Sequence, residues 1–292
     1  MHNFIGIPWQ HFMDFIASAA DRFTILTKIL SKANLEFNVL EFNGYRHIIV
    51  TPPLPGQSNH PPTLLVAHYD RVDGSPGAND NSAGVFILIE TAIKLREKGI
   101  NNWRIILTDG EELKPGESIR DQGAYSLAEG LKNSRIEKSR IFCFDTCGRG
   151  DTMVISTTLD HLLKKERGGI KLKDSLMEHR NFALETAREL RMTKLLLAPT
   201  PFSDDVGFFR AGLAAQTITM LPSNESNLLV SELRKNPEFA EVLVNDQMRQ
   251  NTLTRSIPET WRSLNTAADS YIRLTPKHYK TVINFAEALC NR

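Results

Sequence analysis

The chain has 292 residues, of which 41% are hydrophobic and 24% are charged, as in ordinary globular proteins. Its 35 lysines and arginines nearly balance 34 aspartates and glutamates. The resulting net charge of +1 argues against a protein that binds nucleic acid or a membrane surface through a bulk basic field. The length allows one or two domains, and we expect residues 1–292 to form a single domain.

Cysteine usage and the N-terminal segment favour a cytoplasmic protein. Three cysteines do not suit a disulfide framework or a zinc knuckle, so Cys143 and Cys147 are expected to be buried thiols in a reducing compartment. The first residues lack a basic segment followed by an apolar run and a cleavage site, so we expect no signal peptide. The longest apolar run, Val85 to Ile89, is too short to cross a membrane.

The first half of the chain alternates between helical and strand patterns. Residues 9–32 have helical spacing of apolar residues, and residues 36–50 are typical of two strands around the turn Asn43-Gly44. A connection rich in proline follows. The next predicted elements are a buried strand at 63–70, a loop at 72–81, a helix at 82–98, a strand at 103–108 and a helix at 123–132.

The second half continues the alternation and contains one polar stretch. Residues 222–262 are polar and favour helix, which indicates an insertion or cap. Thr275 is a plausible N-cap with Pro276 at the first helical position of a last helix that reaches about Leu289. The other predicted elements are strands at 139–145 and 152–157, a helix at 172–191, a strand at 193–198, a loop at 200–207 and a strand at 213–221.

Strands that alternate with helices predict a three-layer α/β/α sandwich with a mostly parallel mixed sheet. In such sheets, binding sites lie beyond the carboxyl ends of the strands. Side chains with metal-binding or acid–base chemistry follow three of the predicted strands in this chain, and they are His68, Asp70, Asp80, Glu111, Glu112 and Asp145.

One imidazole among several carboxylates is the ligand set of a zinc or mixed divalent site. The carboxylates repel one another, so the cluster requires cations or protons. His68 and Asp70 are two residues apart on a strand and point to the same face, so His68 can bind a metal while Asp70 orients it. Glu111 and Glu112 diverge, so one can bind a metal while the other accepts a proton from water.

Structural roles compete with these assignments. Asp80 stands where a helix begins, and an N-cap is its ordinary role. Two adjacent glutamates are usually a solvated turn, and Asn265 is a common turn residue. Asp205 can face the pocket or cap a turn, and the Phe208-Phe209 pair belongs to the core before it belongs to a pocket.

Several segments together resemble the two-zinc exopeptidases, a family that includes bacterial leucyl aminopeptidases, glutamate carboxypeptidase II and glutaminyl cyclases. The resemblance extends over about residues 63–270. The matching segments are His68-Tyr-Asp70, Gly77-Ala-Asn-Asp-Asn-Ser-Ala-Gly84, Asp109-Gly-Glu-Glu112, Phe144-Asp145, Ser203-Asp-Asp-Val-Gly-Phe-Phe209 and, less well, Asn265-Thr-Ala-Ala-Asp269.

The resemblance implies a role for each matching site residue. One zinc would bind His68, Asp80 and Asp145, and Asp80 would bridge to a second metal. That second metal would also bind Glu112 and the residue at position 265. Glu111 would be the general base, and Asp70 would lie behind His68.

The sequence departs from the family at the last ligand, where Asn265 replaces histidine. An amide oxygen is a harder and weaker zinc donor than an imidazole nitrogen. We therefore expect zinc in the first site and a second site that is weak, empty or occupied by a harder ion such as Mn or Mg. The histidines that could substitute for the missing ligand are His161, His179 and His278. The segment 113–123 is also longer than the usual turn, and histidine often stands at the position of Asp205 in relatives.

These features favour a zinc-dependent hydrolase of amide bonds, most simply an aminopeptidase-like exopeptidase that acts on a peptide or aminoacyl substrate. The alternative is a non-catalytic relative that binds a peptide or another ligand. Glutaminyl cyclisation is a third option, disfavoured because Asn265 removes a ligand from that branch's single zinc site. No partner that is a nucleic acid or a membrane is expected, and the sequence does not indicate an oligomeric state.

Overall fold

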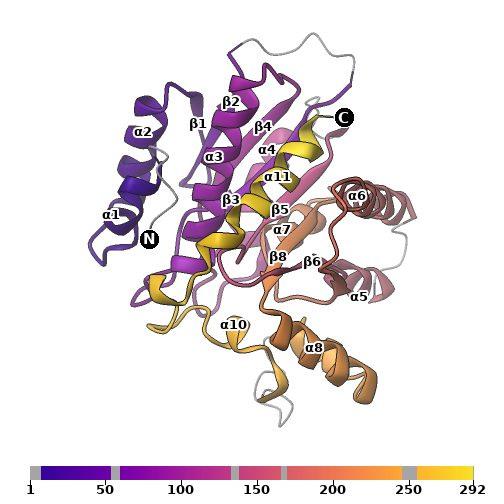
Figure 1. Ribbon diagram of the computed structural model, residues 1–292. Helices are drawn as coiled ribbons and strands as arrows, with labels where there is room; N and C mark the ends of the chain where they lie inside the picture. The colour runs from indigo at the N-terminus through magenta and orange to yellow at the C-terminus, as the bar shows by residue number, and fades with distance from the viewer. Residues whose placement is uncertain (1–7, 54–59, 133–137, 166–169, 245–254, 292) are drawn as a thin grey trace.

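The computed structural model describes residues 8–53, 60–132, 138–165, 170–244 and 255–291 (Figure 1). Its centre is a mixed sheet with eight strands among these residues, in the order β1-β2-β4-β3-β5-β8-β6-β7. The strands are β1 (Glu36–Phe42), β2 (Tyr45–Thr51), β3 (Thr63–His68), β4 (Trp103–Thr108), β5 (Ile141–Phe144), β6 (Thr152–Ser156), β7 (Leu195–Ala198) and β8 (Gln216–Leu221). The four neighbouring strands β4, β3, β5 and β8 are parallel, whereas β1, β2 and β6 introduce antiparallel pairs.

Helices cover both faces of the sheet and make the predicted three-layer α/β/α sandwich (Figure 1). The helices are α1 (Phe12–Ile16), α2 (Arg22–Lys32), α3 (Ala83–Glu97), α4 (Gly123–Leu131), α5 (Thr158–Lys165), α6 (Ile170–Glu189), α7 (Asp204–Arg210), α8 (Ser223–Lys235), α9 (Phe239–Leu243), α10 (Glu259–Arg262) and α11 (Tyr279–Cys290). No helix in the described ranges combines the length and the apolar character that a membrane span requires.

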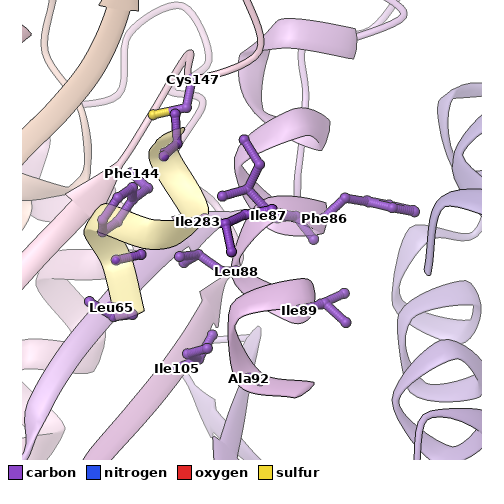
Figure 2. Packing of buried hydrophobic residues seen from close by; sticks show 14 of the residues in the cluster. Leu65, Phe86, Ile87, Leu88, Ile89, Ala92, Ile105, Phe144, Cys147 and Ile283 are labelled. Carbon is purple, nitrogen blue, oxygen red and sulfur yellow. The ribbon is translucent and has the colours of Figure 1, made fainter. Parts of the chain in front are cut away.

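The alternation of side chains along β3 divides the core into two layers. Leu65 and Ala67 face the cluster formed with α3 and α11, whereas Leu64 and Val66 face α4 and α7. Figure 2 shows the first cluster, in which Ile87 and Leu88 of α3 lie beside Ile283 of α11. Because β3 is buried on both faces, its sequence is a continuous apolar run that ends at His68.

The helix predicted over residues 9–32 is wrong, because the chain breaks between Ile16 and Arg22. Ala17 has extended backbone angles, and the Asp21 side chain accepts the backbone N–H of Thr24, so it caps a second helix. Apolar residues on both sides of the break face the same core, which preserves the helical spacing across it.

The last helix begins where the sequence predicts, with Thr275 at the N-cap position and Pro276 at the first helical position. Its first turn, Pro276–His278, is a 3-10 helix that leads directly into α11 at Tyr279. The Thr275 hydroxyl makes no capping hydrogen bond to the helix and instead accepts the backbone N–H of Gly150 at 2.7 Å. The loop predicted over residues 200–207 gives way to α7 at Asp204. The two strands around Asn43-Gly44 are confirmed, and both turn residues have positive φ angles.

The segment 222–262 contributes α8, α9 and α10 to one end of the sheet (Figure 1). Leu229, Phe239 and Trp261 pack there against Val154 of β6 and Leu221 of β8. Residues 245–254 of this segment lie outside the described residues. The segment is therefore a packed part of the fold whose last residues reach the edge where the strands β3, β4 and β5 end.

Candidate functional site

The parallel order β4-β3-β5 brings three sets of polar residues to one edge of the sheet. His68 is the last residue of β3, Glu111 and Glu112 follow β4, and Asp145 follows β5. Asp80 lies in the segment between β3 and α3. The four elements therefore meet at the carboxyl edge, as expected for an open α/β sheet.

His68 is fully buried and lies at the centre of this group. Its Nε2 is 3.1 Å from Asp80 Oδ1 and 3.7 Å from Asp145 Oδ1, and its Nδ1 is 3.4 Å from Asp70 Oδ1. Neither ring nitrogen has a partner with hydrogen-bond geometry, and Asp145 Oδ1 also lacks one, among the described residues. His68 Nε2 and Asp145 Oδ1 face each other without a partner, and a bound cation would be held by the lone pairs of both atoms.

His68, Asp80 and Asp145 fit a divalent metal ion. One ligand atom from each lies within 4.8 Å of the other two, and all three residues are buried. An imidazole nitrogen with two carboxylates is a set that zinc accepts, with a further position left for water or substrate. The buried group can therefore hold a metal ion.

Asp80 does not act as the N-cap of the following helix. The N-cap of α3 is Ser82, and Asp80 has non-helical backbone angles, which turn its carboxylate toward His68. Two residues from distant parts of the chain hold this segment. Arg22 donates to the hydroxyl of Ser82 at 3.0 Å, and the Asp269 carboxylate accepts the backbone N–H of Asp80 at 3.0 Å.

Asp70 links the histidine to the two glutamates. Its carboxylate accepts the backbone N–H of Glu111 at 3.1 Å and that of Glu112 at 3.0 Å, while it also lies beside His68 Nδ1. Asp70 therefore fixes the turn after β4 relative to the imidazole, in the place behind His68 that the sequence predicts.

The side chains of Glu111 and Glu112 diverge. Glu111 Oε1 accepts a hydrogen bond from the side-chain amide of Gln122 at 3.1 Å, and Gln122 is buried at the start of α4. Glu112 Oε2 accepts a hydrogen bond from Asn265 Nδ2 at 2.9 Å. The two carboxylates thus have different neighbours and can perform different tasks.

Asn265 lies beside Glu112, where the sequence places a metal ligand. It has a positive φ of 60°, a conformation that asparagine tolerates better than most residues, so it is also a turn residue. The three other histidines considered as replacements lie elsewhere. His161 is 3.5 Å from Glu241, His179 packs against Phe142, and His278 is in the turn before α11.

Three site residues have no role in the sequence prediction: Gln122, Asp204 and Asp269. Asp204 is buried at the start of α7, and its Oδ2 accepts the hydroxyl of Thr108 at 2.7 Å. Asp205 is also buried, in the first turn of α7 beside Asp204. The motif match contains Asp204 and Asp269 but gave no reason to assign either a contact.

Burial and mutual repulsion disfavour the ionised forms of the carboxyl groups in this cluster. Burial raises the pKa of Glu111 well above its usual value, and Glu112 adds to the rise. Burial and the nearby Asp80 raise the pKa of Glu112 to about 9. Burial likewise raises the pKa of Asp204 to about 7. A bound cation would relieve this repulsion.

The pKa values of His68 and Asp70 shift in the directions expected for an imidazolium beside a carboxylate. Burial alone would lower the pKa of His68, but the carboxylates of Asp145, Asp70 and Asp80 outweigh it and raise that pKa well above its usual value. Burial would raise the pKa of Asp70, but the adjacent His68 imidazole and the hydrogen bonds from the backbone N–H groups of Glu112 and Glu111 lower it. The surrounding carboxylates therefore favour the protonated form of the imidazole.

A pocket of about 190 Å³ opens beside the cluster. Asp80, Glu111, Glu112, Asp145 and Asn265 form its polar side. Its apolar side comes from several elements and includes Val72, Leu113, Ile119, Pro201, Phe202, Trp261 and Leu264. A substrate in this pocket would therefore contact carboxylates at one end and apolar side chains at the other.

Comparison with protein families identifies the chain. The model of peptidase family M28 matches residues 49–230, which include the site residues from His68 to Asp205. The chain belongs to peptidase family M28. Two of the site residues discussed above, Asn265 and Asp269, lie beyond the matched range. No curated protein matches the chain.

Solved structures share the fold of this M28 chain. A zinc aminopeptidase from Bacillus subtilis is 18% identical with a TM-score of 0.53, and the match covers 84% of this chain but 48% of that one. A glutaminyl cyclase from Porphyromonas gingivalis is 14% identical with a TM-score of 0.62, and the match covers 97% and 96%. A Zn-dependent exopeptidase from Parabacteroides distasonis is 12% identical with a TM-score of 0.61, over 98% and 97%. The chain thus spans about half the length of the aminopeptidase.

Proposed function

We propose that this protein is a zinc-dependent exopeptidase that removes residues from the amino terminus of a peptide or aminoacyl substrate. The observation that carries the proposal is the convergence of His68, Asp80 and Asp145 beside Glu111 in one pocket. Membership in peptidase family M28 supports amide hydrolysis as the reaction class.

His68, Asp80 and Asp145 would hold the zinc. A zinc ion there supplies a Lewis acid that polarises the scissile carbonyl and makes water more acidic. Asp70 keeps the His68 ring in place through its contact with Nδ1. The ring then presents Nε2 to the position shared with the two aspartates.

Glu111 is the proposed general base. It lines the pocket and has one carboxylate oxygen fixed by Gln122. Glu111 would accept a proton from the attacking water and deliver it to the leaving amine. Asp70 supports this role through the backbone N–H of Glu111, which it holds at 3.1 Å.

The lining of the pocket favours the amino end of a substrate over its carboxyl end. Among the described residues that line the pocket there is no lysine, arginine or histidine. A terminal carboxylate is normally bound by such cations, and it would be repelled by Asp80, Glu112 and Asp145. A terminal ammonium would instead be attracted.

The second metal site remains a proposal as well. Glu112 and Asn265 would bind a second ion weakly or leave the site empty, or they would accept a harder ion such as Mn or Mg. We also propose that residues 1–292 form one domain and that the protein is cytoplasmic. The segment 222–262 would be a cap over the pocket, because Trp261 of this segment lines the pocket.

A panel of aminoacyl and dipeptide amides, offered with Zn, Mn or Co, tests the proposal. We expect hydrolysis of substrates with a free amino terminus, loss of hydrolysis after chelation and recovery when zinc returns. N-acylated substrates are the matched controls. If no substrate in the panel is hydrolysed while the protein still binds peptides, the non-catalytic alternative replaces the enzyme.

A further inference from the structure

Glu112 differs from the other acidic residues of the pocket in its surroundings. The atoms that converge as metal ligands belong to His68, Asp80 and Asp145, and Glu112 is not among them. Its Oε2 is instead bound by Asn265 Nδ2 at 2.9 Å. Its Oε1 is buried and has no hydrogen-bond partner among the described residues. One oxygen of this carboxylate is therefore held by Asn265, and the other is a buried acceptor without a partner among the described residues.

The charge of the pocket calls for more than one cation. Asp80, Glu111, Glu112 and Asp145 all line it, and together they carry four negative charges when ionised. A single divalent ion compensates two of them. A buried carboxylate that lacks a counter-ion is costly, so the remaining charge favours a cationic ligand near Glu112.

We propose that Glu112 and Asn265 form a receptor for the terminal ammonium group of the substrate, in place of a second metal ion. This inference rests on the proposed exopeptidase function and adds the group that recognises the amino end. An ammonium has three N–H donors, and the pair offers the free oxygen of Glu112 and the amide oxygen of Asn265 as acceptors.

The Glu112 side of the receptor is anchored through its backbone. The backbone N–H of Glu112 donates to Asp70 Oδ2 at 3.0 Å, which ties the receptor to the residue that also orients His68. The ammonium end of a substrate would therefore be placed at a fixed distance from the proposed zinc ligands. A fixed distance between the terminal amine and the site of attack is what limits an exopeptidase to the first residue.

Asn265 is suited to this role by the direction of its hydrogen bond. The side-chain amide donates to Glu112, so the carboxylate gains a partner without gaining a charge. A histidine there would add a nitrogen ligand for a second metal, which would compete with the ammonium for Glu112. The asparagine thus favours a cationic substrate over a second ion.

Equilibrium binding of two small alcohols tests the receptor without turnover. L-Leucinol and 4-methylpentan-1-ol differ only in the amino group and have an apolar side chain suited to the wall that contains Leu113 and Ile119. Binding to the zinc-loaded protein is measured by calorimetry. We expect the wild type to bind L-leucinol at least ten-fold more tightly than 4-methylpentan-1-ol.

The Glu112→Gln variant should reduce this preference at least ten-fold and leave the affinity for 4-methylpentan-1-ol unchanged. The variant should also keep one zinc per chain by metal analysis. Glu117→Gln is the matched control, because it removes the same charge from an exposed loop residue outside the lining of the pocket. Asn265→Leu is a second variant that disturbs the receptor without changing its charge.

Three outcomes would overturn the receptor: an unchanged preference in Glu112→Gln, loss of zinc from that variant, or a preference that appears only when a second ion is bound. The proposed function fails separately. If the protein hydrolyses aminoacyl substrates but Glu112→Gln keeps the preference for L-leucinol, the receptor alone is refuted. A Glu112-dependent preference without any hydrolysis refutes the enzyme and leaves the receptor.

Discussion

The carboxylate of Asp269 is hydrogen-bonded to the backbone of Asp80, 189 residues earlier in the chain. Its second oxygen accepts the backbone N–H of Asn79 at 2.9 Å. Asp269 therefore helps to position Asp80, a proposed zinc ligand, through the backbone. Burial and the nearby Asp80 raise the pKa of Asp269 to about 7, which reflects the cost of placing it there.

The Asp269→Asn variant should bind zinc more weakly than the wild type. Its amide can accept only one of the two backbone N–H groups, so the segment that contains Asp80 loses one anchor. Supporting residues of this kind typically change metal affinity by about 10- to 100-fold. Competition with a chromogenic chelator measures the change. Asp14→Asn, on the exposed side of α1, is the control, and equal affinities in the two variants would contradict the role of Asp269.

Substitution of Glu111 should separate chemistry from metal binding. Glu111→Gln keeps the shape of the side chain but cannot accept a proton, so turnover should fall by about 100-fold or more. Zinc content should stay at the wild-type value, because His68, Asp80 and Asp145 are unchanged. Steady-state kinetics and metal analysis are the two measurements. Full activity in the variant would remove Glu111 from the mechanism.

The Asn265→His variant should restore a second metal ion. An imidazole beside Glu112 provides a nitrogen donor where the chain now has an amide. We expect metal content after dialysis against zinc to rise from about one to about two ions per chain. Unchanged metal content would show that position 265 does not reach a second site.

Arg22 should contribute strongly to stability because it donates hydrogen bonds to the backbone of the segment between β3 and α3. Its guanidinium donates to the carbonyls of Tyr69 at 2.9 Å, Asp70 at 3.1 Å and Pro76 at 2.9 Å. Arg22→Met would leave the carbonyls of Tyr69 and Asp70 without this donor, whereas the Pro76 carbonyl keeps a hydrogen bond from Arg71. The substitution should lower the free energy of unfolding by about 3 kcal/mol. Urea unfolding gives the value, and the exposed Lys28→Met on the same helix should change it by less than about 0.5 kcal/mol.

Asp151 should make stability depend on pH in the acid range. Burial opposes the shift, but the hydrogen bonds from Lys194 and Ser223 together outweigh it and lower the pKa of Asp151 from 3.8 to about 2. Because the folded pKa lies below the unfolded one, the stabilisation is present above pH 4 and disappears as the pH falls toward 2.

Asp151 and Lys194 are partly exposed, so we expect a modest contribution of about 1 kcal/mol at pH 7. Asp151→Asn should therefore be less stable than the wild type at pH 7, and the two unfolding curves should converge near pH 2. A difference that stays constant from pH 7 to pH 2 would show that the charge of Asp151 plays no part.

The sequence predicted the sheet and the central residues of the site for a shared physical reason. Apolar runs such as β3 end in polar residues, and parallel neighbouring strands must place those residues together. His68 and Asp145 could be paired in this way although 76 intervening residues separate them. The family match of residues 49–230 agrees with the resemblance found in the motifs.

Gln122, Asp204 and Asp269 could not be predicted in the same way. Each acts through one tertiary contact, and a single glutamine or aspartate in a loop or at a helix start more often caps a helix or stabilises a turn. The break after Ile16 was missed for a related reason, because both short helices face the same core and keep one spacing of apolar residues. The spacing of apolar residues indicates which face of a helix is buried, but it does not show whether the helix is interrupted.

The two anchors of the segment that contains Asp80 come from distant parts of the sequence. Arg22 lies on α2 and Asp269 follows α10, so both segments must dock before the loop takes the shape that turns Asp80 toward His68. Zinc affinity would then report on completed tertiary structure and not on the formation of local secondary structure.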